Sequence, residues 1–290
     1  MIVRQQDRVL VQGITGRQGS FWTERMQAYG TRIVGGVNPK KAGSEHCGVP
    51  VFASARDAMD QAGFNASVLF IPPLAAKGAA LDAVEAGAKT LVMLTEFVPV
   101  QDVMEILAAA RTHGCCVVGP NTAGLVTPGE CFVGIMPGFN GNIFQPGRIG
   151  VISRSGSLGT LLCLNLVRAG FGQSAFIGIG GDPVSGTTMR EALERLDADE
   201  RTDAVVLVGE IGGAKEEEAA DYAAGMAKPV VAFIAGRASP PGKKMGHAGA
   251  IVMGDQGTHA SKKAAFEAAG VQVLDMPSGV GPALSAALAG

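Results

Sequence analysis

The chain reads, from its first aliphatic run onward, Arg8-Val9-Leu10-Val11-Gln12-Gly13-Ile14-Thr15-Gly16-Arg17-Gln18-Gly19. Glycines three residues apart allow a tight turn and bring backbone N–H groups against a pyrophosphate at the start of the following helix. The spacing is G-x-x-G-x-x-G, whereas the dinucleotide fingerprint is G-x-G-x-x-G, and a strand–helix turn without a ligand could carry the same glycines. The stretch predicts the first strand and helix of a Rossmann-like domain with a candidate phosphate-binding turn.

The same strand–helix rhythm continues along the chain. We expect strands at Arg8–Gln12, Arg32–Val37, Ser67–Ile71, Thr90–Leu94, Cys115–Val118, Arg148–Ser153, Gln173–Ile179, Ala204–Gly209, Pro229–Ile234 and Val271–Leu274. We expect helices at Ser20–Tyr29, Ser54–Gln61, Ala75–Ala86, Gln101–His113, Leu158–Ala169, Thr188–Leu196, Lys215–Met226, Thr258–Ala269 and Gly279–Leu288. Alternation at this spacing predicts α/β architecture, with parallel sheets covered by helices on both faces.

One segment, Thr122–Gly147, breaks the rhythm. It carries six glycines together with Pro128, Pro137 and Pro146, a composition typical of a linker. We therefore predict a Rossmann-like domain over residues 1–121, a linker over 122–147, and a flavodoxin-like, doubly wound parallel-sheet domain over 148–290. A length of 290 residues suits two domains.

Composition narrows the class of protein. A hydrophobic content of 47% with 17% charged residues indicates a well-filled core, and the net charge of −2 argues against nucleic-acid binding. The five cysteines have no CxxC spacing, so we expect reduced thiols and a cytoplasmic protein. The N-terminal residues lack a signal-peptide pattern, and no run of about 18 apolar residues predicts a membrane span.

Two further features of the first half could bind a ligand. Lys40 and Lys41 follow the second expected strand, where NAD-binding domains usually place an acid, and they would suit an extra phosphate. The alternative is a pair of solvated loop lysines. Glu96, in Leu94-Thr95-Glu96, ends the fourth expected strand, where ligands sit in open parallel sheets, although it could equally cap the next segment.

The second half contains a candidate anion site and an unusual histidine. Ser155, Gly156 and Ser157 open an expected helix, either as an anion site or as an ordinary serine cap. His247 lies between glycines after two lysines, in Gly242-Lys243-Lys244-Met245-Gly246-His247-Ala248-Gly249. A phosphorylated histidine needs a nucleophilic ring nitrogen and an acceptor on the other nitrogen, and Glu210, at a strand end, could be that acceptor.

Several further short motifs follow one another along the chain. They are Gly35–Pro39, Gly119–Asn121, Thr127–Glu130, Ser153–Gly156, Gly178–Pro183, Gly209–Gly213 and Gly246–Ile251. Together with Gly13–Gly19, this set resembles the α subunit of succinyl-CoA synthetase, the NDP-forming succinate–CoA ligase family, over essentially the whole chain. The segment around His247 is similar to that family's phosphohistidine loop.

The resemblance implies a two-subunit ligase. ATP or GTP, with Mg²⁺, would bind a partner β subunit with an ATP-grasp domain, in an αβ or α2β2 assembly, and phosphorylate His247. The phosphoryl group would pass to a small carboxylic acid, and the thiol of CoA would attack the acyl phosphate. The resemblance implies that Glu210 orients the histidine, that Ser155, Gly156 and Ser157 stabilise its phosphate, and that CoA is held by Thr15, Gly16, Arg17, Gln18, Lys41, Leu94, Thr95 and Glu96.

The chain departs from the family pattern where the acid should bind. Succinate-specific members commonly read S-G-T-L-T-Y-E, but here Thr160 replaces the tyrosine and Leu161 the glutamate. Malate–CoA ligase members share the Leu-Gly pair but keep Tyr-Glu. Phe97 replaces a usual glycine, and Thr122-Ala123 is a further departure. The expected substrate is therefore a succinate-like acid, with malate or another small acid, including a sulfonate-bearing one, as the alternative.

Two readings from other classes of protein remain. An NADP-dependent oxidoreductase could be built on the first glycine turn, although the missing acid and the two lysines after the second strand speak against NAD. A CoA-binding regulatory protein would bind CoA without phosphorylation of His247, although the presence of both His247 and Glu210 argues against it.

Overall fold

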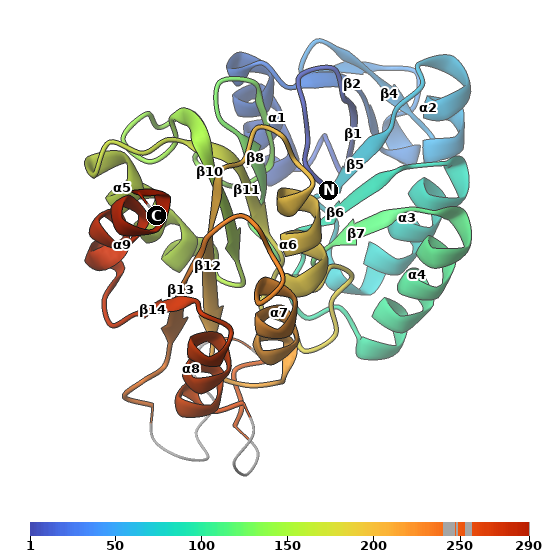
Figure 1. Cartoon of the computed structure of the whole chain (residues 1–290). Coiled ribbons are helices and arrows are strands. Elements are labelled where there is room, and N and C mark those ends of the chain that lie inside the picture. The colour runs from blue at the N-terminus through green and yellow to red at the C-terminus, as the bar shows by residue number, and fades with distance from the viewer. Residues whose placement is uncertain (240–246, 248, 253–256, 290) are drawn as a thin grey trace. The chain divides into compact units, whose positions relative to one another are not determined.

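The computed structural model describes residues 1–239, 247, 249–252 and 257–289 and divides the chain into two compact units (Figure 1). The first unit comprises Met1, Val3–Phe139 and Val184–Gly186. The second comprises Ile2, Asn140–Pro183 and Thr187–Gly290. No helix in the described ranges is long and apolar enough to span a bilayer.

The first unit is built on a seven-stranded sheet in the order β3-β4-β2-β1-β5-β6-β7, and it also contains the antiparallel β8–β9 hairpin. Its elements are β1 Arg8–Gln12, α1 Arg17–Tyr29, β2 Arg32–Val37, the 3-10 turn η1 Pro39–Lys41, β3 Glu45–His46, β4 Val49–Phe52, α2 Ala55–Gln61, β5 Ala66–Leu69, α3 Pro73–Ala86, β6 Thr90–Met93, α4 Val100–His113, β7 Cys116–Val118, β8 Gly124–Thr127 and β9 Cys131–Gly134. Apart from β3–β4, the pairs in this sheet are parallel, and the strand order changes direction at β1, as in a Rossmann fold.

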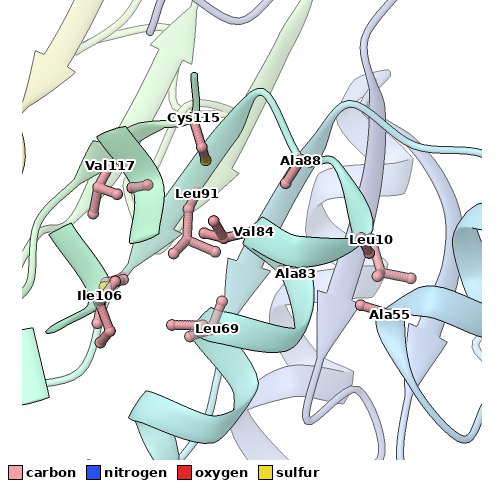
Figure 2. Packing of buried hydrophobic residues seen from close by; sticks show 14 of the residues in the cluster. Leu10, Ala55, Leu69, Ala83, Val84, Ala88, Leu91, Ile106, Cys115 and Val117 are labelled. Carbon is pink, nitrogen blue, oxygen red and sulfur yellow. The ribbon is translucent and has the colours of Figure 1, made fainter. Parts of the chain in front are cut away.

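The core of the first unit lies between this sheet and helices α2, α3 and α4 (Figure 2). Leu10, Leu69 and Leu91 come from three neighbouring strands and are fully buried. Helix α3 presents small residues to them, including the buried Ala83 and Val84, so the helix approaches the sheet closely. Helix α1 contacts β1 and β2 of this sheet and also β9 of the hairpin.

The turn between β1 and α1 requires its glycines. Gly13 has a φ of +77°, and a Cβ there would lie 2.4 Å from the carbonyl oxygen of Phe70. A Cβ on Gly19 would lie 2.2 Å from the carbonyl oxygen of Gly13. A side chain with a Cβ does not fit at either position, so glycine allows α1 to begin close to the end of β1.

The second unit places its strands in the order β14-β13-β12-β10-β11, the flavodoxin-like arrangement. Its elements are β10 Pro146–Ser153, α5 Gly156–Arg168, β11 Gln173–Gly178, α6 Met189–Asp197, β12 Ala204–Glu210, α7 Lys215–Ala223, β13 Val230–Ala235, α8 His259–Ala268, β14 Gln272–Leu274, the 3-10 turn η2 Pro277–Gly279 and α9 Val280–Ala289. All four neighbouring pairs in this order are parallel.

Helices cover this second sheet in two groups. Helices α6, α7 and α8 pack side by side, and α5 packs with α9. Helix α6 begins with a complete capping box in which Thr188 and Glu191 satisfy each other's backbone N–H groups. The central strand β12 is buried along its whole length and delivers Glu210 at its carboxyl end.

The predicted α/β class, Rossmann-like in the first unit and flavodoxin-like in the second, is confirmed. The sequence patterns did not indicate β3 and β4, or β8 and β9 within residues 122–147. These strands lie in stretches rich in glycine and proline, whose composition indicates turns rather than strands.

Candidate functional site

The side chain of His247 points at a carboxylate. Its Nδ1 lies 2.8 Å from Oε2 and 2.9 Å from Oε1 of Glu210. A carboxylate accepts hydrogen bonds, so Nδ1 carries the proton and the lone pair of the neutral ring resides on Nε2. The Glu210 side chain is only 9% exposed, whereas that of His247 is 29% exposed. A fixed tautomer on a reachable imidazole is the arrangement that nucleophilic chemistry at Nε2 requires.

Glycines bring backbone close to this imidazole. A Cβ on Gly181, which follows β11, would lie 2.5 Å from Cγ of His247. The N–H of Gly249 donates to the carbonyl oxygen of Gly181 at 3.1 Å, which attaches the histidine segment to that loop. The remaining flanks of the predicted loop, Gly242–Gly246 and Ala248, lie outside the described residues.

The predicted anion site is the first turn of α5. The Ser155 hydroxyl caps this helix by accepting from the N–H of Leu158 at 3.4 Å, and Ser157 lies 3.3 Å from it. The first turn contains no acidic residue, so the positive end of the helix dipole is not compensated there. The positive end of the helix dipole favours an anion, and the exposed Ser157 hydroxyl is accessible to one.

Arg154 joins this helix start to the histidine pair. Its Nη2 lies 3.3 Å from Oε1 of Glu210, and a Cβ on Gly249 would lie only 2.8 Å from the same nitrogen. Its side chain is 6% exposed. Arg154 precedes Ser155 in the chain, and its buried guanidinium contacts Glu210, the partner of His247; sequence reasoning gave this arginine no role.

Behind Arg154 lies a buried ion cluster that sequence reasoning missed. Arg154 pairs with Glu216 at 2.9 Å, and Lys262 pairs with Glu216 at 2.5 Å and with Glu217 at 3.0 Å. Burial would raise the pKa of Glu216, but the adjacent Arg154 and Lys262 cations hold it below its ordinary value. In the sequence, Glu216 and Lys262 each stand beside other charged residues. They therefore resemble solvent-exposed helix residues, and no local signal distinguishes them.

Thr160, the predicted substrate residue, is the fifth residue of α5 and lies one turn after Gly156. Its hydroxyl donates to the carbonyl oxygen of Gly156 at 2.8 Å, and it is half-buried. Leu161 beside it is 40% exposed. The buried side of the helix is formed instead by Gly159, Leu162, Cys163 and Leu166. The positions that depart from the family pattern therefore lie at the accessible side of the helix start.

The predicted CoA residues gather on one edge of the first sheet. Gly16, Arg17 and Gln18 are exposed at the start of α1, which has no side-chain cap and no acid in its first turn. The amide of Asn38, which was not predicted, donates to the Thr15 hydroxyl at 2.5 Å, and its oxygen accepts from the N–H of Lys40 at 3.0 Å. Asn38 thus connects the glycine turn to the turn that contains Lys41.

Leu94, Thr95 and Glu96 follow the carboxyl end of β6 on the same edge. The Thr95 hydroxyl donates to the carbonyl oxygen of Ile71, which follows β5, at 2.7 Å, and the Thr95 carbonyl oxygen accepts from the N–H of Asn121 at 3.0 Å. Glu96 is exposed. Parallel pairing of β1, β5 and β6 brings their carboxyl ends together, as expected for a ligand edge in an open sheet.

Within the described part of the chain, no group of three or more His, Cys, Asp or Glu side chains is arranged to hold a metal ion.

Family models match both units of the chain. A CoA binding domain matches residues 4–97, and a CoA-ligase domain matches residues 152–272.

Two relatives and one solved structure are similar over nearly the whole chain. The α subunit of the ADP-forming succinate–CoA ligase of Methanothermobacter thermautotrophicus is 51% identical over 97% of this chain and 94% of its own. The ADP-forming sulfoacetate-CoA ligase subunit SauD of Bilophila wadsworthia is 41% identical over 99% of both chains. The ATP citrate lyase of Methanothrix soehngenii, solved with citrate and coenzyme A, matches with a TM-score of 0.87 at 22% identity.

The lyase likeness shows the fold alone, and this chain spans 50% of that longer chain. The relatives of comparable length are stronger evidence because of their identity and coverage. The chain belongs to the family of α subunits of ADP-forming succinate–CoA ligases, which confirms the resemblance seen in its motifs, and it is an acid–CoA ligase subunit.

Proposed function

We propose that this member of the ligase family carries a phosphoryl group on Nε2 of His247 and joins a small carboxylic acid to CoA by way of an acyl phosphate. The observation that carries the proposal is the contact of 2.8–2.9 Å between Nδ1 of His247 and the buried Glu210 carboxylate. This contact keeps the nucleophilic lone pair on Nε2 and stabilises the positive charge that the ring gains when Nε2 is phosphorylated.

In the first step, Nε2 attacks the terminal phosphorus of a nucleoside triphosphate, the N–P bond forms, and the nucleoside diphosphate leaves. In the second, an oxygen of the acid attacks that phosphorus and the N–P bond breaks. In the third, the CoA thiolate attacks the acyl carbon and inorganic phosphate leaves. The uncompensated start of α5, with Ser155, Gly156 and Ser157, would hold the phosphoryl oxygens.

CoA fits the edge of the first sheet. The opening N–H groups of a helix have no intrahelical partner, and α1 presents Gly16, Arg17 and Gln18 there without an acid. The exposed Lys41 adds a cation suited to a phosphate of CoA. Thr15, Leu94, Thr95 and Glu96 complete the proposed contacts, and CoA itself supplies the thiol.

A partner subunit would supply the nucleotide. The similar proteins are named as subunits, and ATP or GTP with Mg²⁺ on a β subunit with an ATP-grasp domain would complete the enzyme, as αβ or α2β2. The described residues of this chain place no metal cluster beside His247.

A succinate-like acid is the first candidate, because the relatives with the highest identities among those compared are named for succinate. Thr160 and the partly exposed Leu161 favour a second candidate, since they replace a phenol and a carboxylate of the family pattern. Loss of the phenol and the carboxylate would reshape the pocket for a different small acid, and a relative of nearly equal length is named for sulfoacetate. Malate is a further member of this second group.

The test is to co-express the chain with a β subunit of this ligase family, taken from the same genome, and to measure thioester formation from CoA, ATP or GTP, and a panel of succinate, malate, sulfoacetate and acetate. We expect ATP- or GTP-dependent thioester from one acid, and none with His247→Ala. Full activity of His247→Ala would overturn the mechanism. CoA binding without phosphorylation would instead identify a regulatory protein, and nicotinamide-dependent turnover an oxidoreductase.

A further inference from the structure

Glu216 on α7 and Lys262 on α8 form an ion pair at the centre of the second unit. Their Oε2 and Nζ atoms lie 2.5 Å apart, and both side chains are fully buried. Burying a single unpaired charge is very costly, so two such residues persist only as partners. The pair is not part of the nucleophile or of the proposed phosphate site, which raises the question of what it does.

The pair is continuous with His247 through alternating charges. Glu216 pairs through its second oxygen with Nη1 of Arg154 at 2.9 Å, and Nη2 of Arg154 lies 3.3 Å from Glu210. Glu210 in turn contacts Nδ1 of His247. The order is therefore Lys262, Glu216, Arg154, Glu210, His247, with each group next to one of opposite charge when the imidazole is protonated or phosphorylated.

Glu216 also acts on Glu210 directly. The backbone N–H of Glu210 donates to Oε1 of Glu216 at 3.2 Å, and Arg154 Nη1 donates to the carbonyl oxygen of Gly212 at 3.1 Å. A Cβ on Gly209 would lie 2.9 Å from Cγ of Glu216, so the glycine before Glu210 makes room for this contact. Both the backbone and the side chain of Glu210 are thus held by the cluster.

We propose that Glu216 and Lys262 are positioning residues for His247, which hold Arg154 against Glu210 and so fix the direction and the charge of the carboxylate that sets the histidine tautomer. The proposal deepens the phosphohistidine function and rests on it. Three carboxylates and two cations meet behind the ring, Glu210, Glu216, Glu217, Arg154 and Lys262, which leaves one excess negative charge for a cationic imidazole to balance.

Removing the two charges should shift the pKa of His247 in opposite directions. Removing the Glu216 charge, as in Glu216→Gln, takes away a negative charge behind Glu210 and leaves the Arg154 cation less compensated, so the pKa of His247 should fall. Removing the Lys262 charge, as in Lys262→Met, takes away a positive charge, so the pKa should rise. A purely structural role would lower stability in both variants without moving the pKa in opposite directions.

Other charged groups near the histidine stay constant across these variants. They are Glu210 on β12, Arg154 after β10, Lys215 and Glu217 on α7, and Asp182 beside Gly181. Burial, followed by the Arg154 charge, lowers the pKa of Lys215. Because none of these is substituted, a shift can be assigned to the altered charge.

The experiment is an NMR titration of the full chain labelled in its four histidines, with His247 assigned by comparison with His247→Ala. Glu216→Gln, Lys262→Met and the double variant are titrated beside the native chain. Leu193→Ala serves as a control, because truncating this buried α6 side chain should lower stability without changing charge. We expect the His247 midpoint to fall in Glu216→Gln, to rise in Lys262→Met, and to return toward the native value in the double variant.

The rate of His247 phosphorylation in the complete complex is measured in parallel. We expect a loss of about 10- to 100-fold in each single variant, as for a small misplacement of a catalytic group, and partial recovery in the double variant. Midpoints that do not move, or that move in the same direction in both single variants, would overturn the inference. If a single variant does not fold, the double variant decides, and a native midpoint with near-native phosphorylation supports the pairing whereas an unrecovered rate refutes it.

The two proposals fail separately. A native complex in which His247 is never phosphorylated would refute the proposed function whatever the midpoints do. A native complex that is phosphorylated normally, with midpoints indifferent to both charges, would leave that function intact and refute the positioning role.

Discussion

The two candidate sites of this chain lie at the carboxyl edges of two parallel sheets and are built from different groups. In the first unit, the strand ends are followed by glycines, exposed side chains and the start of α1, so backbone N–H groups are the main resource. In the second unit, the strand ends deliver buried charges, Arg154 and Glu210, supported by two more from α7 and α8. A site made of backbone suits a large anionic ligand, whereas a site made of paired charges suits one reactive atom whose position must be fixed.

The largest expected effect is on the second site. Substituting His247→Ala should abolish phosphorylation of the chain, because it removes the proposed nucleophile Nε2. The ring is 29% exposed, so thermal stability should change little. Acid-labile label transferred from the nucleoside triphosphate in the assembled complex measures this, and label retained on the variant would place the phosphoryl group elsewhere.

Glu210→Gln should come next. The amide keeps the shape but loses the charge that stabilises the cationic ring, so we expect the phosphorylation rate to fall by about 10²–10⁴-fold. The measurement is the single-turnover rate of labelling. Glu218→Gln, on the exposed side of α7, is a matched control that should retain the native rate.

Gly13→Ala tests the first site. A Cβ would meet the Phe70 oxygen at 2.4 Å in addition to the cost of a positive φ, so we expect a loss of more than about 2 kcal/mol of stability and loss of CoA binding. Gly43→Ala is the control, since Gly43 has a φ of +82° but nothing within 4 Å, and should lose only about 1 kcal/mol.

The same variant separates the two sites. If CoA is bound only by the first unit, folded Gly13→Ala should still become phosphorylated on His247 but form no thioester. Thermal unfolding, calorimetric CoA binding and label transfer on the same preparation check this, and loss of phosphorylation in a folded sample would contradict the separation.

Lys41→Ala should have a smaller effect. An exposed lysine that contacts a phosphate contributes through a screened charge, so we expect CoA affinity to fall by about three- to tenfold and the difference to shrink at high salt. Binding of CoA and of dephospho-CoA should be compared. An equal loss for both ligands would remove the 3′-phosphate as the partner of Lys41.

The smallest effect, and a favourable one, is expected for Phe97→Gly. Phe97 has a φ of +61° and is 81% exposed, so its ring gains little from burial while its backbone is strained. Glycine should raise the free energy of unfolding by about 0.5–1 kcal/mol. Denaturant titration measures this, and a decrease would show that the Phe97 ring makes a stabilising contact that exceeds the strain.

The contrast between the sites also explains what could be predicted. The glycine turn and the α5 cap are each encoded in a short contiguous motif, His247 and Glu210 lie in two such motifs, and the alternation of strands and helices follows from the rhythm of buried runs. Asn38 was not predicted because its two hydrogen bonds link separate turns. Glu216 and Lys262 are surrounded in the sequence by other charges, and only the packing of α7 against α8 reveals that these two are buried.

The start of α5 has a consequence for mutational tolerance. Its folding depends on one side, where Gly159 meets Phe176 and Leu162 is fully buried, while Thr160 satisfies its hydroxyl within the helix and Leu161 is partly exposed. Changes at positions 160 and 161 should therefore be nearly silent in stability. If these two residues contact the acid, as proposed, single substitutions there can change the substrate range with little loss of stability. A library that varies only positions 160 and 161 is therefore the shortest route to a ligase that accepts a different acid.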